Sequence, residues 1–184
     1  MVHGIWRVVC LVAAFSILVA AVVLSGAGPV ELGPSATNRR VAALLEASHG
    51  SPSTADLAEA ERLTRTSLFW SPTTPGLWAR LAYIQALRHG RIDAEASRLL
   101  LRSYKLAPVD PGLGPWRVNL VFGRWSDCSP PLRAAAAAEA AALYQRLDPA
   151  LRDERLAAVR DPAGHFALSL VLGSSQTADG VAKP

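Results

Sequence analysis

Cysteine is scarce in this chain of 184 residues, which has only two. Cys10 lies in a long apolar stretch near the amino terminus, and Cys128 is far downstream. Two thiols placed in this way are not expected to pair, and neither has a second cysteine at the spacing typical of a metal site. The sequence therefore argues against a disulfide scaffold and against a metal centre built on cysteine.

The short motifs that carry catalysis or cofactor binding are also missing. There is no glycine-rich phosphate loop and no Gly-x-Ser-x-Gly elbow. Carboxylate pairs such as Asp56 with Glu59 stand among arginines on expected helices, where solvated ion pairs are the ordinary interpretation. No ligand spacing such as His-x-x-x-His links the four histidines, which are His3, His49, His89 and His165. We expect no catalytic residue, no metal site and no cofactor.

Strand signals are missing as well, since no run of alternating β-branched residues and no hairpin signal occurs. Apolar residues recur instead at helical spacing, in segments separated by proline and glycine. Ser53 and Asp56 resemble a capping box, and Asp93 is placed to cap another helix. An all-α fold is therefore expected. Its helices are predicted at residues 39–48, 54–72, 76–89, 94–106, 115–126, 131–147, 149–160 and 163–172.

Charge of one sign is only slightly in excess, with nineteen Lys plus Arg against fifteen Asp plus Glu, a net charge of +4. Lys105 and Lys183 are the only lysines, so nearly all of the positive charge is arginine. The arginines are dispersed along the expected helices rather than clustered with stacking aromatic residues, as a nucleic-acid interface would require. We therefore expect no nucleic-acid partner.

One long hydrophobic run is present. From Val8 to Ala27, only Ser16, Ser25 and Gly26 fall outside the hydrophobic class. Twenty residues of helix span about 30 Å, which is enough to cross a bilayer. Arg7 precedes the run, so the amino terminus should remain in the cytoplasm and the rest of the chain should lie beyond the membrane.

A cleaved signal peptide competes with this anchor, because Ser25, Gly26 and Ala27 offer small residues of the kind that signal peptidase recognises. We favour the anchor because the run exceeds the 7 to 15 residues usual in a signal core. In both interpretations the rest of the chain is exported. We therefore expect a single-pass bacterial inner-membrane protein with a periplasmic domain. The expected parts are 1–27 (signal-anchor or signal peptide), 28–38 (linker), 39–172 (helical domain) and 173–184 (flexible tail).

An internal repeat organises the helical domain. The corner Pro72-Thr-Thr-Pro-Gly-Leu-Trp78 is matched 36 residues later by Pro108-Val-Asp-Pro-Gly-Leu113, followed after two inserted residues by Trp116. A third helix ending of the same kind stops at Pro149, 41 residues after Pro108. A period of this length with two helices per unit is typical of a helical solenoid, in which each unit buries its apolar face against its neighbour.

At these residues the chain resembles the tetratricopeptide repeat family. Gln85 stands where a large aromatic residue is expected, and the units are longer than the usual 34 residues. The resemblance covers about residues 39–149 and implies about three helix-turn-helix units. The matching residues are Trp78, Leu81, Ala82, Gly90, Ala96, Leu100, Ser103, Pro108, Trp116, Leu120 and Pro149.

The resemblance also implies a binding surface, because in that family the first helices of successive units line a concave groove that holds peptides. The family's carboxylate clamp of lysines and asparagines is absent. Arginine and aromatic side chains would suit an acidic or aromatic peptide. By position, the expected groove residues are Ala79, Tyr83 and Leu87 from one unit and Arg117, Val121, Arg124 and Trp125 from the next.

The expected function is that of a non-enzymatic, membrane-anchored scaffold or adaptor that binds partner proteins in a bacterial cell-envelope complex. Proteins of the resembled kind often serve polysaccharide assembly, secretion or cytochrome maturation, and the sequence does not select among these. Two alternatives stay open: a cleaved, soluble periplasmic repeat protein, and an envelope enzyme whose site the sequence does not reveal.

Overall fold

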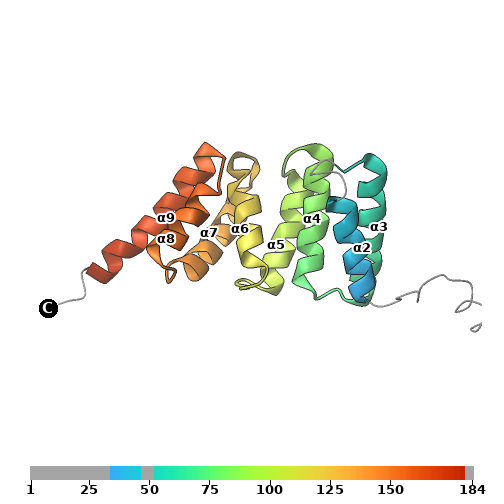
Figure 1. The fold of residues 1–184 in the computed structure, drawn as a ribbon, viewed down its shortest axis with the longest axis horizontal. Helices are drawn as coiled ribbons and strands as arrows, with labels where there is room; N and C mark the ends of the chain where they lie inside the picture. The colour runs from blue at the N-terminus through green and yellow to red at the C-terminus, as the bar shows by residue number, and fades with distance from the viewer. Residues whose placement is uncertain (1–33, 47–51, 181–184) are drawn as a thin grey trace, which may run out of the picture. The chain divides into compact units, whose positions relative to one another are not determined.

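The computed structural model of the protein describes residues 34–46 and 52–180, and every regular element in them is helical (Figure 1). The all-α prediction is therefore confirmed for the described residues. In chain order the elements are α2 (Pro34–Glu46), α3 (Thr54–Trp70), α4 (Pro75–His89), α5 (Ala94–Leu106), α6 (Gly114–Phe122), the short 3₁₀ helix η1 (Trp125–Asp127), α7 (Pro130–Tyr144), α8 (Pro149–Ala157) and α9 (Pro162–Gly180).

The chain divides into two compact units, Met1–Asn38 and Arg39–Pro184. Nearly all of the described residues belong to the second unit. None of the helices in the described ranges is long and apolar enough to cross a membrane. The predicted anchor, from Val8 to Ala27, lies outside the described residues.

Several helix ends are set by capping residues that can be recognised in the sequence. The Ser53 hydroxyl accepts a hydrogen bond from the Asp56 amide at 3.1 Å, and the Asp56 carboxylate accepts one from the Ser53 amide, so the predicted capping box is confirmed. The Asp93 carboxylate accepts a 2.8 Å hydrogen bond from the Ala96 amide at the start of α5. Helix α4 ends at Gly90 with φ 69°, a left-handed conformation that favours glycine.

Several helix boundaries differ from the prediction: α6, α7 and α8 end three or four residues early, and the largest differences are at the start of α2 and the end of α9. Helix α2 begins at Pro34 rather than residue 39, because proline, which we took as a linker residue, is well tolerated in a first helical turn. Helix α9 continues to Gly180 and not to residue 172. A single glycine such as Gly173 costs a helix about 1 kcal/mol relative to alanine, which weakens a helix without ending it. The start of the predicted tail is therefore helical.

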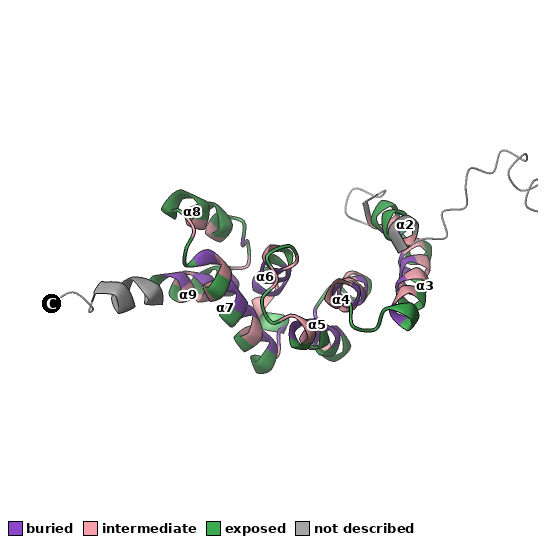
Figure 2. Ribbon diagram, turned by 90° about the horizontal axis from the view of Figure 1, so that it is seen from below, coloured by how far each residue is buried: buried purple, intermediate pink, exposed green. Residues whose placement is uncertain are grey.

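The helices pack mainly against their neighbours in the chain. Helix α4 contacts both α3 and α5, α6 contacts α7, and α9 contacts α6, α7 and α8. Buried residues form stripes along these helices, with exposed residues on the opposite sides (Figure 2). The main apolar cluster joins α4, α5, α6, α7 and α9, with Leu68 of α3 at its edge. A smaller cluster of Val41, Leu57, Ala60 and Ile84 joins α2, α3 and α4.

Helix α9 approaches α6 more closely than a side chain would permit. A Cβ atom built on Gly164 would lie 1.8 Å from the carbonyl oxygen of Phe122. Both residues are buried, and Phe122 is completely so. The absence of a side chain at Gly164 is therefore what allows the two backbones to meet.

One polar cluster lies inside the core and joins α5, α6 and α7. The side chains of Arg117 on α6 and Glu139 on α7 are both 0% exposed and form an ion pair. Arg117 also donates to the Ser103 hydroxyl at 3.1 Å and to the Ala107 carbonyl at 2.9 Å. Glu139 accepts a further hydrogen bond, at 3.1 Å, from the Asp110 amide. Each charge thus has partners, as buried charges require.

Candidate partner-binding groove

A hollow of about 400 Å³ lies where α2, α4 and the beginning of α6 come together. We call it the α4 groove, because α4 contributes three of its lining residues. Apolar side chains make up most of its lining, and Arg80 supplies the one side chain that is charged at neutral pH. The lining residues are Ala42 and Leu45 of α2, Gly76, Arg80 and Tyr83 of α4, Leu113 before α6, and Trp116 of α6.

The wall formed by α4 follows from helical geometry. Gly76, Arg80 and Tyr83 stand at positions i, i+4 and i+7, which fall on one face of a helix. The Tyr83 ring meets the Trp116 ring edge to face, with centroids 5.6 Å apart and an interplanar angle of 79°. This aromatic pair connects α4 to α6, and Trp116 remains 38% exposed. The groove therefore presents an aromatic surface held in a fixed geometry.

Arg80 gives the groove its charge. It is half-buried, and burial lowers the pKa of its guanidinium. Arginine nevertheless remains protonated at neutral pH. A cation beside Leu45, Leu113 and two aromatic rings favours a ligand that combines an apolar side chain with an anionic group.

Three of the predicted groove residues lie on α4, in different surroundings. Tyr83 lines the α4 groove. Leu87, one turn further along α4, packs against the small cluster that contains Val41 and Ile84. Ala79 on the same helix is completely buried. Only Tyr83 of this set is therefore available to a partner in the hollow.

The predictions for Arg117 and Val121 are wrong as to exposure. Both side chains are 0% exposed, Arg117 in its ion pair with Glu139 and Val121 in the main apolar cluster. The physical reason is that this face of α6 is turned toward the core, where Arg117 meets Ser103 of α5 and Glu139 of α7. A buried, paired guanidinium cannot bind a peptide carboxylate in a surface groove.

Arg124 and Trp125 lie beyond the end of α6 and outside the α4 groove. Trp125 opens η1 and stacks on Phe122, with ring centroids 4.6 Å apart. The Arg133 guanidinium lies 5.4 Å from the centroid of the same ring. Arg124 is half-buried, and its carbonyl accepts a hydrogen bond from the Cys128 thiol at 3.2 Å. These residues cover the core at the turn between α6 and α7.

The sequence interpretation missed most of the groove lining. Trp116 was named as a residue of the repeat pattern and not of a binding surface, and Arg80 was not singled out. The spacing of Gly76, Arg80 and Tyr83 is the signal that could have found the α4 wall. The α6 wall was misplaced because Trp116 itself lines the groove, whereas the following position, Arg117, and Val121 are turned into the core.

The described residues show no arrangement suited to metal binding, since no three His, Cys, Asp or Glu side chains converge in them. His89 lies 2.6 Å from a carboxylate oxygen of Asp93, which also caps α5. That pair sits on the surface where α4 turns into α5, away from the α4 groove. The lining of the α4 groove offers apolar contact and one cation.

Comparison of the chain with protein-family models, with curated proteins and with solved structures gave no match.

Proposed function

We propose that this protein is a non-enzymatic scaffold or adaptor with a tetratricopeptide-like helical domain, and that it binds a segment of a partner protein in the α4 groove. The observation that carries the proposal is the partly exposed Trp116 beside Tyr83 and Arg80. Tryptophan, tyrosine and arginine are the residues that most often dominate the binding energy of protein interfaces. The ligand that fits is a peptide segment with an aromatic or aliphatic side chain next to a carboxylate.

The cellular setting belongs to the same proposal. The run from Val8 to Ala27 anchors the protein in a bacterial inner membrane, and the helical domain works on the periplasmic side within an envelope complex. Support for the anchor comes from the length and composition of the run. A released periplasmic form, cleaved after Ala27, is the competing state.

Site-specific photo-crosslinking in the native host tests the groove. A photoreactive benzoylphenylalanine is placed at Ala42 or at Trp116 in the full chain, and at Trp70 as a control outside the groove. We expect both groove positions to yield an adduct with the same envelope protein, and position 70 to yield none. Absence of a shared adduct, or an equal adduct at position 70, would contradict the groove assignment.

A matched pair of tryptophan variants sharpens the same test. Trp116→Ala should weaken partner binding by about 2 kcal/mol or more, and the adduct formed from position 42 should fall accordingly. Trp70→Ala removes a tryptophan that is 77% exposed at the end of α3 and should leave the adduct unchanged. Circular dichroism checks that both variants are folded. Equal losses in the two variants would refute a role specific to Trp116.

Topology and anchoring are tested separately. The intact mass of the protein purified from membranes should correspond to the uncleaved chain. A mass that lacks residues 1–27 would mean that this segment is a cleaved signal peptide and not an anchor. A reporter fused after Pro184 should be active only if it is periplasmic. Activity of a cytoplasm-specific reporter at that position would overturn the proposed location.

A further inference from the structure

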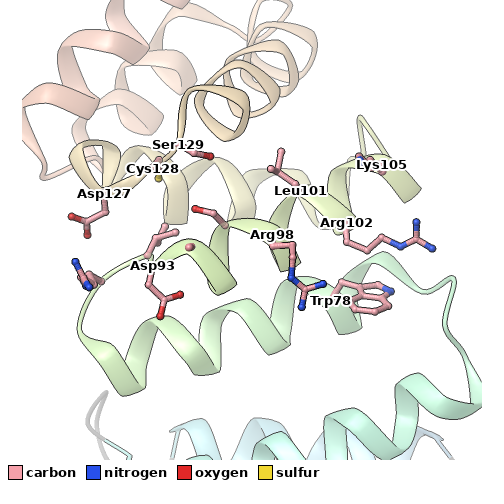
Figure 3. Close-up of a pocket in the computed structure, with 13 residues that line it drawn as sticks. Trp78, Asp93, Arg98, Leu101, Arg102, Lys105, Asp127, Cys128 and Ser129 are labelled. Atoms are coloured by element: carbon pink, nitrogen blue, oxygen red, sulfur yellow. The ribbon is translucent and has the colours of Figure 1, made fainter.

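A second and larger hollow, of about 740 Å³, follows the length of α5. We call it the α5 groove. It is lined by Trp78 of α4, by one side of the segment from Arg91 to Lys105, and by residues 127–129 before α7 (Figure 3). Ser97, Leu101 and Lys105 stand four residues apart along this wall, as one face of a helix requires.

The cations in the α5 groove are concentrated near the end of α5. Arg98, Arg102 and Lys105 all line the groove within the last two or so turns of the helix. Arg98 donates two hydrogen bonds to Glu95, so its charge is largely compensated. In the described part of the chain no carboxylate lies within ion-pair distance of Arg102 or Lys105. This end of the groove therefore offers two uncompensated positive charges.

The opposite end has a different character. Arg91 lies there together with Asp93 and Asp127. Asp93 is engaged by the Ala96 amide and by His89, and the Ala96 hydrogen bond is the main reason that its pKa lies below the usual value. A uniformly anionic polymer would meet two carboxylates here. The distribution of charge instead suits a ligand whose anionic groups are gathered at one end.

Apolar surface lies between and beneath the charges. The Trp78 indole donates a 2.8 Å hydrogen bond to the Pro72 carbonyl, which holds the ring in place, and the Arg102 guanidinium lies 5.8 Å from the ring centroid. Leu101 and Cys128 also line the hollow. Burial raises the pKa of the Cys128 thiol to about 12, so this side chain is a neutral part of the lining and not a nucleophile.

A buried hydroxyl without a partner completes the lining. Among the described residues, the Ser129 Oγ atom has no hydrogen-bond partner, although it is shielded from solvent at the edge of the groove. Buried polar atoms are usually satisfied, and a main-chain group of a bound peptide could pair with this one. The groove thus presents uncompensated cations, fixed apolar surface and an available hydrogen-bonding group.

We propose that the α5 groove is a docking site for an extended acidic peptide segment of a partner protein. From Ala94 to Lys105, α5 rises by about 16 Å, a length that about five extended residues cover. Carboxylates of the segment pair with Arg102 and Lys105, and its aliphatic side chains pack on Trp78 and Leu101. Arginine binds carboxylates with two hydrogen bonds, which fixes the orientation of the segment.

This site is separate from the α4 groove and does not depend on it. Trp78 lies about 140–160° around α4 from the stripe of Gly76, Arg80 and Tyr83, at 100° per residue. The two hollows therefore open on opposite sides of the same helix. A protein that binds one partner in each groove would bring two proteins together, yet either site could exist without the other.

Fluorescence anisotropy of the full chain in detergent tests the proposal. The probe is a fluorescein-labelled octapeptide with four glutamates and two leucines, and its control carries glutamine in place of each glutamate. We expect the acidic peptide to bind and the control peptide to bind at least tenfold more weakly. The affinity for the acidic peptide should also fall as salt rises. Equal binding of the two peptides would overturn the proposal.

Two double variants locate the binding. Arg102→Glu with Lys105→Glu should weaken binding of the acidic peptide at least tenfold. Arg146→Glu with Arg160→Glu makes the same change of charge at exposed positions outside the groove and should change the affinity less than twofold. If both pairs of substitutions weaken binding equally, the peptide is attracted by the positive charge of the protein as a whole. That result would overturn the assignment of the binding site to the α5 groove.

Two further probes distinguish other occupants and contacts. Inorganic polyphosphate is the first probe. If it binds through Arg102 and Lys105 and the acidic peptide does not bind, the groove is a polyanion site and the proposal is overturned. A photoreactive leucine in the peptide should crosslink to Trp78 or to residues 98–105, as mapped by mass spectrometry. Crosslinks confined to the α4 groove would also overturn it, while leaving the proposed scaffold function intact.

Discussion

The junction between α4 and α5 and the junction between α6 and α7 are built in different ways. At the first, the buried residues of both helices are mostly leucine and alanine, among them Leu81, Ala82, Ala96 and Leu100. At the second, a completely buried ion pair of Arg117 and Glu139 stands among the apolar residues. Two helix pairs with similar corner sequences thus rely on different physical forces.

Because of this difference, the two junctions should lose stability through different kinds of mutation. An apolar junction loses stability in proportion to the volume removed, because each lost methyl group removes contacts and leaves a cavity. A buried ion pair responds to the loss of one member by leaving the other charge without compensation. It responds much less to replacement of both members, because their attraction is balanced against the cost of removing them from water.

The largest expected effect comes from breaking the ion pair. Glu139→Ala leaves the Arg117 guanidinium buried with only the Ser103 hydroxyl and the Ala107 carbonyl as hydrogen-bond acceptors. We expect the free energy of unfolding to fall by about 4 kcal/mol. Urea unfolding of the full chain in detergent, followed by circular dichroism, measures it. A loss below about 1 kcal/mol would show that the junction does not need the pair.

A comparable truncation at the apolar junction should cost somewhat less. Leu100→Ala removes a completely buried side chain from α5 and should lower the free energy of unfolding by about 3 kcal/mol. The same unfolding experiment measures the change. Leu151→Ala, at an exposed position on α8, is the control and should have little effect. Similar losses in the two leucine variants would contradict the assignment of Leu100 to the core.

A smaller effect is expected at the start of α5. Asp93→Ala removes the cap on the Ala96 amide and should cost about 1 kcal/mol at pH 7. The pKa of Asp93 in the folded protein lies below its unfolded value of about 3.9, so the carboxylate stabilises the fold above that pH. This stabilisation is lost as the pH falls through the folded pKa. The gap in stability between the variant and the unmodified chain should therefore narrow below about pH 4, and a constant gap would exclude a role for the charge.

The smallest loss is expected from replacing both members of the ion pair. Arg117→Met with Glu139→Leu substitutes apolar side chains of similar volume, and the double variant should be about as stable as the unmodified chain or more stable. Urea unfolding beside Glu139→Ala provides the comparison. A double variant as unstable as Glu139→Ala would mean that the hydrogen bonds to Ser103, Ala107 and Asp110, rather than charge balance, hold this junction together.

The helices were the most predictable part of the molecule. Helices α3, α4 and α5 lie within a residue or two of their predicted ranges, because Ser53, Gly90 and Asp93 mark the ends by local chemistry. The start of α2 was misplaced, since proline disfavours the middle of a helix and is accepted at its beginning.

The candidate site was less predictable, since it depends on which helix faces meet. Tyr83 lies in the lining of the α4 groove, whereas Arg117, which was expected at the surface because charged residues usually lie there, is buried. Its partner, Glu139, is 22 positions away on another helix. Nothing in the residues next to Arg117 indicates such a partner, so its burial becomes evident only when α6 and α7 are placed together.

The contact between Gly164 and the Phe122 carbonyl has a consequence for how this protein can change over time. Every other amino acid carries a Cβ atom, so no missense mutation at codon 164 can preserve the approach of α9 to α6. Such a position is closed to substitution by the packing of the two helices. Related chains that keep this helix packing should keep glycine there, even where the residues of both grooves have diverged to suit other partners.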